Sequence, residues 1–243
     1  MTTTSRIGRA ATSSDLAGSV VCIGHSHATP VARAAQAQGC DVDPILFWSE
    51  TDAVGADGAL RPDLADRIRR ARKVITAVGG ASAVVVGLVE HQRAFDFVLP
   101  AEPELPLDLT RELLPADAVR AALAAEEGKY TSLLEQIKAL SSGDVVQLET
   151  PPPVEDGAFI SGFVPWPLWP DQPQIVAPAT LRYKLWRLSS EVVAATCARL
   201  GVIYQPAPRA SLSRGGFMAP GLSSDGIHGD TAYGQLVWDS LRP

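Results

Sequence analysis

Short apolar runs alternate with helix-like segments over the first eighty residues, and this alternation constrains the fold more than any other feature of the chain. The apolar runs 19–23, 44–48 and 73–78 have the length and the partly β-branched composition of buried strands. Helices are predicted at 31–38 and 62–72, because a proline stands at the start of each segment. Strands that alternate with helices form parallel sheets with helices on their faces. The sequence therefore predicts an α/β fold.

The rest of the chain is less regular, but it continues with helices and strands. Further elements are predicted as a helix from Pro115 to Gly143, a strand at 145–148, a helix over 181–200, a strand at 202–204 and a closing helix at 231–241. Long loops are predicted at about 99–115 and 151–178. The second of these holds eight prolines, which argue against a helix or a central strand there. We predict one domain over 18–243, preceded by a flexible leader at 1–17.

Charge and composition exclude several classes of partner. The formal net charge is −6 and the isoelectric point is about 5.2, so nothing favours binding to nucleic acid or to an anionic membrane surface. No apolar run reaches the roughly 20 residues that span a bilayer. The leader lacks the apolar core of a secretion signal, and the odd count of 3 cysteines suits a reducing compartment. We therefore expect a cytoplasmic protein without a cofactor, and its oligomeric state stays open.

The candidate chemistry begins at Ser26, which follows the first predicted strand and precedes a helix. Ligands bind at the carboxyl ends of the strands in open parallel sheets. A serine needs a base to become a nucleophile, and the chain has four histidines, at 25, 27, 91 and 228. His25 and His27 flank the serine, so their side chains would point away from it in an extended segment. His228 stands three residues after Asp225, close enough for a hydrogen bond that orients the imidazole.

The pattern Gly-x-Ser-x after the first strand, with Asp-x-x-His near the C-terminus, resembles the SGNH hydrolases, also called GDSL-like esterases. The resemblance runs from about Val20 to Val237 and includes Gly79-Gly80 after the third strand. It implies a three-layer α/β/α sandwich with a mainly parallel, flavodoxin-like sheet. It also implies a serine-dependent acyl hydrolase or acyltransferase that acts on a small-molecule acyl substrate. In that resemblance Ser26 matches the nucleophile, His228 the base and Asp225 the third member.

The sequence departs from the family at the groups that would stabilise the oxyanion. The family has Gly-x-Asn in its third block, whereas Ala81 follows Gly80 here and cannot donate a side-chain hydrogen bond. Losing one such donor typically costs ~10²–10³ in rate. The second-block glycine has no clear match, with Gly55 and Gly58 both candidates. Replacement donors could come from His25, His27 or Ser82, beside the backbone N–H groups of Ser26, Gly80 and Ala81.

Other interpretations remain open for these residues. Ser26 could cap a helix, and Asp225 and His228 could form only a hydrogen-bonded turn. The protein could be a repurposed SGNH-like domain that binds a ligand or partner, or a metal-dependent hydrolase using His25, His27 and His228. Trp166 and Trp169 could line a substrate site or pack the proline-rich loop. His91 is predicted to be structural or exposed at the rim of the site, and not catalytic. Solvated surfaces are predicted for one helix face and one acidic loop, comprising Arg182, Lys184, Arg187 and residues 102–108.

Overall fold

The computed structural model describes residues 20–47, 49–50, 52–79, 94–163 and 176–241. The strands of its main sheet are β1 (Val20–Gly24), β2 (Val42–Leu46), β3 (Lys73–Ala77), β6 (Asp144–Leu148) and β7 (Ile203–Gln205). The helices are α1 (Ala28–Ala37), α2 (Pro62–Arg70), α4 (Ala116–Leu140), α5 (Gly157–Phe163), α6 (Ala179–Leu200) and α7 (Thr231–Ser240), with a 3₁₀ turn at Arg209–Ser211. Two short strands, β4 (Phe95–Asp96) and β5 (Glu112–Leu113), pair separately from the main sheet.

The main sheet is wholly parallel, in the order β2-β1-β3-β6-β7. Chain order reverses beside β1, because β2 pairs with one edge of β1 and β3 with the other. In doubly wound sheets the crevice at such a reversal is where ligands bind. The last residues of three strands, Gly24, Leu46 and Ala77, lie in register at the carboxyl end of the sheet, beside this crevice. The predicted α/β class with a parallel, flavodoxin-like sheet is confirmed.

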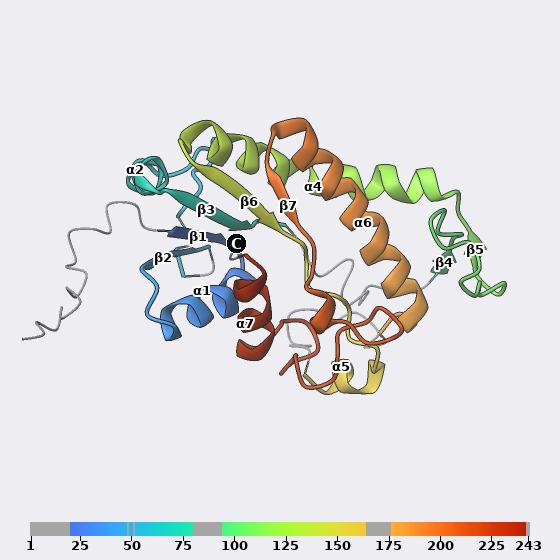
Figure 1. Ribbon diagram of the computed structural model, residues 1–243. Coiled ribbons are helices and arrows are strands. Elements are labelled where there is room, and N and C mark those ends of the chain that lie inside the picture. The colour runs from blue at the N-terminus through green and yellow to red at the C-terminus, as the bar shows by residue number, and fades with distance from the viewer. Residues whose placement is uncertain (1–19, 48, 51, 80–93, 164–175, 242–243) are drawn as a thin grey trace, which may run out of the picture.

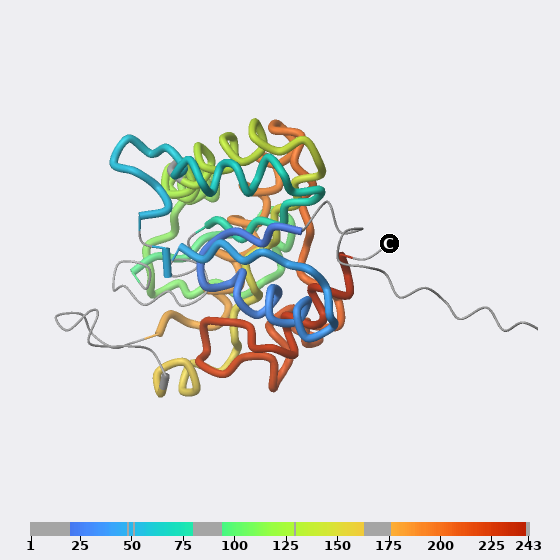
Figure 2. The backbone as a smooth tube through the Cα atoms, turned by 90° about the vertical axis from the view of Figure 1, so that its left-hand side faces the viewer, coloured from blue at the N-terminus to red at the C-terminus, as the bar shows by residue number. Residues whose placement is uncertain are grey.

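Helices cover both faces of the sheet, which gives three layers (Figure 1). Strand β1 shows how alternate residues serve the two faces, because Val21 and Ile23 pack with α2, α4 and α6. Cys22, between them, packs with α1 and α7. Helices α1 and α7 also contact each other extensively, so the first and last helices of the described chain lie side by side (Figure 2).

A second apolar cluster extends beyond the sheet, where the first half of α4 and α6 meets α5 and the segment after β4. Its centre is formed by residues with almost no exposed surface, including Phe97, Leu99, Ile160 and Leu188. This cluster attaches the loop-rich half of the chain to the sheet half.

The structure corrects two expectations about the loops. The segment 151–178 is not wholly irregular, because α5 forms inside it. Its prolines stand at 151–153 and from 165 onward, and the intervening residues carry none, so a short helix fits between them. The segment 99–115 likewise contains β5, whose two residues pair with β4.

The predicted solvated face of α6 is wrong for two of its three residues. Arg182 is 1% exposed and Lys184 is fully buried. Arg182 donates hydrogen bonds to the carbonyl oxygens of Val154, Glu155 and Ala177, which stand on both sides of the α5 segment. Lys184 pairs with buried Asp96, as discussed below. The acidic loop 102–108 is also not simply solvated, because Glu102 accepts a hydrogen bond from Tyr183 and Asp108 pairs with Arg111.

Candidate active site

A close backbone approach sets the position of Ser26. Gly24, the last residue of β1, has φ +154°, and a Cβ there would collide with the carbonyl oxygen of Ala77. Only glycine therefore allows the chain to leave the sheet so near β3. The backbone N–H of His25 donates to that same carbonyl at 3.1 Å. Ser26 follows at the entrance to α1, beside the reversal of strand order.

The structure brings Ser26, His228 and Asp225 together across 202 residues of sequence. The Nε2 atom of His228 lies 2.8 Å from Oγ of Ser26, and its Nδ1 atom lies 2.6 Å from Oδ2 of Asp225. An ionised carboxylate can only accept a hydrogen bond, so Nδ1 carries the proton and Nε2 accepts from the serine hydroxyl. Ser26 does not cap α1, because the N-cap residue is His27 and no side chain caps that end.

The turn that carries His228 is itself organised around Asp225. Oδ1 of Asp225 accepts the backbone N–H groups of Ile227 and His228, at 2.9 and 2.7 Å. Partial burial raises the pKa of Asp225, but the hydrogen bonds from the His228 side chain and from these two backbone groups outweigh it and lower the pKa to about 2. The turn and the pairing with His228 are therefore one arrangement, in which Asp225 stays ionised.

The two histidines that flank Ser26 face different surroundings. His27 has helical backbone angles, so the segment is not extended, and its ring centroid lies 5.2 Å from that of His228. Its Nδ1 atom is buried without a hydrogen-bond partner in the described part of the chain. Burial, with the nearby charges of His228 and His25, lowers the pKa of His27 to about 3. His25 instead packs edge-on against the rings of Phe47 and Tyr130.

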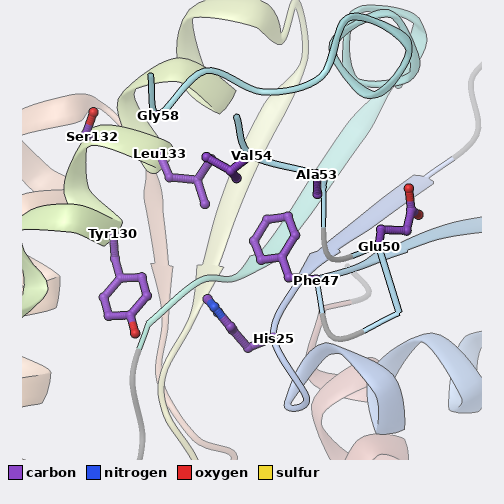
Figure 3. A pocket seen from close by; sticks show the side chains of 9 residues that line it. All are labelled: His25, Phe47, Glu50, Ala53, Val54, Gly58, Tyr130, Ser132 and Leu133. Atoms are coloured by element: carbon purple, nitrogen blue, oxygen red, sulfur yellow. The ribbon is translucent and has the colours of Figure 1, made fainter. Parts of the chain in front are cut away.

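His25 also lines a cavity of about 480 Å³ at the carboxyl end of the sheet (Figure 3). The wall is formed by residues that follow β2 and by the middle of α4, namely Phe47, Glu50, Ala53, Val54, Gly58, Tyr130, Ser132 and Leu133. A second cavity, of about 520 Å³, lies between α5 and residues 213–223. Ser223 lines this second cavity and donates a hydrogen bond to the carbonyl oxygen of His228.

The structure changes the assignment of the oxyanion donors. The N–H of Gly58 donates to Gly55, and that of Gly55 donates to Ala59, at 2.9 and 2.8 Å. Both groups are thus used within a turn, so neither glycine offers a backbone donor, and Gly58 contributes only to the cavity wall. The predicted positions Gly80, Ala81 and Trp166, together with Ser82, Trp169 and His91, lie outside the described residues.

Among the described residues, no ligand set supports the metal-site alternative. Across the described ranges, no group of three or more His, Cys, Asp or Glu side chains is arranged to hold a metal ion. His25 and His27, which that alternative pairs on one face, point into different environments.

Sequence reasoning named His25 and Gly58 as candidate site residues, but it missed the other residues that line the first cavity. Phe47 lies within the predicted strand 44–48, and Tyr130 lies on the apolar period of a predicted helix, so both were assigned to the core. A signal did exist for Phe47 and Glu50, because they follow β2 at the same sheet edge as Ser26. The phase of α4, which brings Tyr130 to that edge, is set by packing and cannot be read from the sequence.

Comparisons with known proteins identify the fold. No protein-family model matches the sequence, and no curated protein matches it either. Among solved structures, a protein from Streptococcus pneumonia proposed to be a platelet activating factor is similar with a TM-score of 0.52 and 11% identity, over 94% of this chain and 84% of that one. Phospholipase A1 from Streptomyces albidoflavus is similar with a TM-score of 0.50 and 15% identity, over 92% and 99%.

A GDSL-like lipase from Bacteroides thetaiotaomicron also matches, with a TM-score of 0.45 and 14% identity, over 93% of this chain and 86% of that one. In the described part of the chain, no helix is both long and apolar enough to cross a membrane. The structural neighbours are esterases, lipases and acetyltransferases of one fold. This chain has the α/β fold of the SGNH, or GDSL-like, hydrolases.

Proposed function

We propose that this protein is a serine-dependent acyl hydrolase or acyltransferase in which Ser26 is the nucleophile, His228 the base and Asp225 the residue that orients the base. The observation that carries this proposal is the continuous hydrogen-bond relay from Ser26 Oγ through His228 to Asp225, with distances of 2.8 and 2.6 Å. A nucleophile, a base within reach and a third group that orients the base are the arrangement that activates a serine.

The relay supports a two-step reaction. Ser26 Oγ attacks the carbonyl carbon of an ester while His228 Nε2 accepts the hydroxyl proton. The imidazolium, stabilised by Asp225, returns that proton to the leaving oxygen as the C–O bond breaks, which leaves an acyl group on Ser26. Water or another alcohol then attacks the acyl-enzyme, with His228 taking the proton of the acceptor and passing it to Ser26. Hydrolysis and acyl transfer differ only in this acceptor.

The site can also stabilise the oxyanion of each tetrahedral intermediate. Ser26 lies two residues before the first residue of α1, so its backbone N–H stands at the positive end of that helix. The shared fold adds support, because one of the similar structures is described as a phospholipase, an enzyme that cleaves esters. A small acyl ester is therefore the expected substrate, and the cytoplasm remains the proposed location.

The test is Ser26→Ala against a generic aryl ester, together with labelling by a fluorophosphonate probe. We expect the wild type to be labelled once per chain and the variant not at all. Turnover should fall by at least about 10³-fold in the variant, because only binding and oxyanion stabilisation remain. Unlabelled wild type, or full activity in Ser26→Ala, would refute the nucleophile and favour a protein that only binds a ligand or partner.

A further inference from the structure

The cavity beside His25 is joined directly to the strand that delivers Ser26. Its wall begins at Phe47, whose backbone N–H donates to the carbonyl oxygen of Gly24 at 3.0 Å. His25, the residue immediately before Ser26, forms part of the same wall (Figure 3). The cavity therefore lies at the carboxyl end of β1, and one of its lining residues, His25, is the sequence neighbour of the candidate nucleophile.

The chemistry of the cavity wall favours an apolar occupant. Phe47, Ala53, Val54 and Leu133 supply apolar surface, and Leu133 continues into the buried core. Among the described residues of the wall, Glu50 supplies the one carboxylate, and that carboxylate has cationic partners.

Two arginines, one in α2 and one in the turn before it, form ion pairs with that carboxylate. Oε2 of Glu50 lies 2.9 Å from Arg61, and Oε1 lies 3.5 Å from Arg67. The described part of the wall thus offers no unpaired charge that would require a charged ligand.

The position of the base decides which part of an ester enters this cavity. His228 must reach the leaving oxygen to return a proton to it, so the leaving group lies towards His228. No residue of the segment 213–230, which carries His228 and borders the second cavity, lines the cavity beside His25. The acyl part of the ester, on the other side of the carbonyl carbon, therefore points towards His25, Phe47 and Tyr130.

We propose that this cavity is the acyl-binding site and that it selects linear aliphatic acyl chains longer than acetyl. The inference rests on the proposed function and adds the substrate class to it. A volume of about 480 Å³ falls within the range of roughly 300–1,000 Å³ that is typical of small-molecule sites, and an acetyl group would leave most of it unfilled. Each methylene that enters apolar surroundings contributes about 0.8 kcal/mol, which corresponds to roughly a fourfold change.

The test is a series of p-nitrophenyl esters from acetate to octanoate, assayed with the wild-type protein. We expect kcat/KM to rise by roughly fourfold per added methylene until the cavity is filled. The variants Val54→Trp and Ser132→Trp place a large ring in the cavity from its rim, where both native residues are exposed. Each should abolish the rise in kcat/KM from acetate to octanoate, because the added ring occupies the volume that the longer acyl chains would fill.

Val98→Trp is the matched control, because Val98 is an equally exposed valine that lines none of the cavities described above. It should keep the wild-type chain-length profile. A wild-type profile that is flat or falls beyond acetate overturns the inference without any variant. Tryptophan variants that keep the preference for long esters overturn it as well. In either case the loss of activity in Ser26→Ala would still support the proposed function, so the two failures can be told apart.

Discussion

Asp225 is the residue whose charge the candidate site depends on most. Its carboxylate accepts hydrogen bonds from Nδ1–H of His228 and from two backbone N–H groups of the same turn. An asparagine in this place would keep the size of the side chain, but its amide could turn its N–H₂ group towards Nδ1. The imidazole would then carry its proton on Nε2 and could not accept the proton of Ser26.

Asp225→Asn should therefore lower kcat for ester hydrolysis by about 10⁴-fold while KM changes little. Because the pKa of Asp225 is lowered to about 2, its carboxylate stays ionised above about pH 4. Any activity lost above that pH must therefore come from another group. A pH profile of kcat/KM for the wild type checks this point. Retention of more than a tenth of the wild-type kcat in Asp225→Asn would contradict the orienting role.

His27 gives a different pH dependence, in stability rather than in chemistry. Burial lowers its pKa from 6.5 to about 3 in the folded protein, whereas in the unfolded chain it regains the ordinary value. Below pH 6.5 the unfolded state therefore binds a proton at His27 that the folded state does not bind. The free energy of unfolding falls as the pH falls from 6.5 towards 3.

Between pH 7 and pH 5 this single group should cost about 2 kcal/mol of unfolding free energy. Urea denaturation at the two pH values measures the loss. The phenyl ring in His27→Phe is similar in size and does not titrate. Between pH 7 and pH 5 this variant should therefore lose about 2 kcal/mol less unfolding free energy than the wild type. Equal losses in the two proteins would show that His27 is protonated in the folded state.

Residues with rare chemistry could be predicted from the sequence, and residues placed by packing could not. Four histidines left few possible bases, so the pairing of Ser26 with His228 was open to reasoning. Gly58 shows the limit of that reasoning. A glycine in a loop is a plausible backbone donor, but whether its N–H is already used in a turn depends on local geometry that no pattern specifies.

At the scale of elements, α6 shows why charge patterns mislead. Its basic residues Arg182, Lys184 and Arg187 were predicted to form a solvated helix face, because charged side chains are seldom buried. Here the cluster around Phe97 covers that side, and Lys184 reaches buried Asp96 at 2.9 Å and the carbonyl oxygen of Pro106 at 2.8 Å. The segments that bury it lie some 80 residues earlier in the chain, so the sequence around Lys184 does not indicate its partner.

Lys184→Met should destabilise the protein by about 3–5 kcal/mol, because it leaves the carboxylate of Asp96 buried without its cation. Adding Asp96→Asn should restore part of the loss by removing the charge. Arg199→Met on the same helix is the control, since its pair with Glu135 is largely exposed and should contribute less than about 1 kcal/mol. Urea denaturation compares the unfolding free energy of these three variants with that of the wild type. Equal losses in Lys184→Met and Arg199→Met would contradict the role of burial.

At the scale of the whole molecule, the candidate site is assembled from the two ends of the described chain. Ser26 precedes α1, and His228 precedes α7. The alternation of strands and helices was enough to predict a parallel sheet. Each crossover helix returns the chain to the end of the sheet where the previous strand began, so the next strand runs in the same direction. The order of the strands was implied only by the family resemblance and not by the pattern itself, and the contact between α1 and α7 was not predictable, since it depends on which faces fit together.

That contact depends on a glycine. Gly234 lies in the first half of α7, and a Cβ there would collide with the backbone carbonyl of Pro30 in α1. The helices can approach so closely only because position 234 has no side chain. Since α7 begins three residues after His228 and α1 begins two residues after Ser26, their separation also sets the distance between base and nucleophile.

Gly234→Ala should therefore lower both stability and kcat, although alanine is intrinsically the better helix former by about 1 kcal/mol. Gly128→Ala is the matched control: Gly128 lies inside α4, and a Cβ there would meet no other atom within 4 Å. The control should gain roughly 0.5–1 kcal/mol of stability and keep full activity. Thermal unfolding and ester hydrolysis on both variants separate helix propensity from helix contact. If Gly234→Ala behaved like Gly128→Ala, the α1–α7 contact would not position the site, and the turn around Asp225 would have to hold His228 without it.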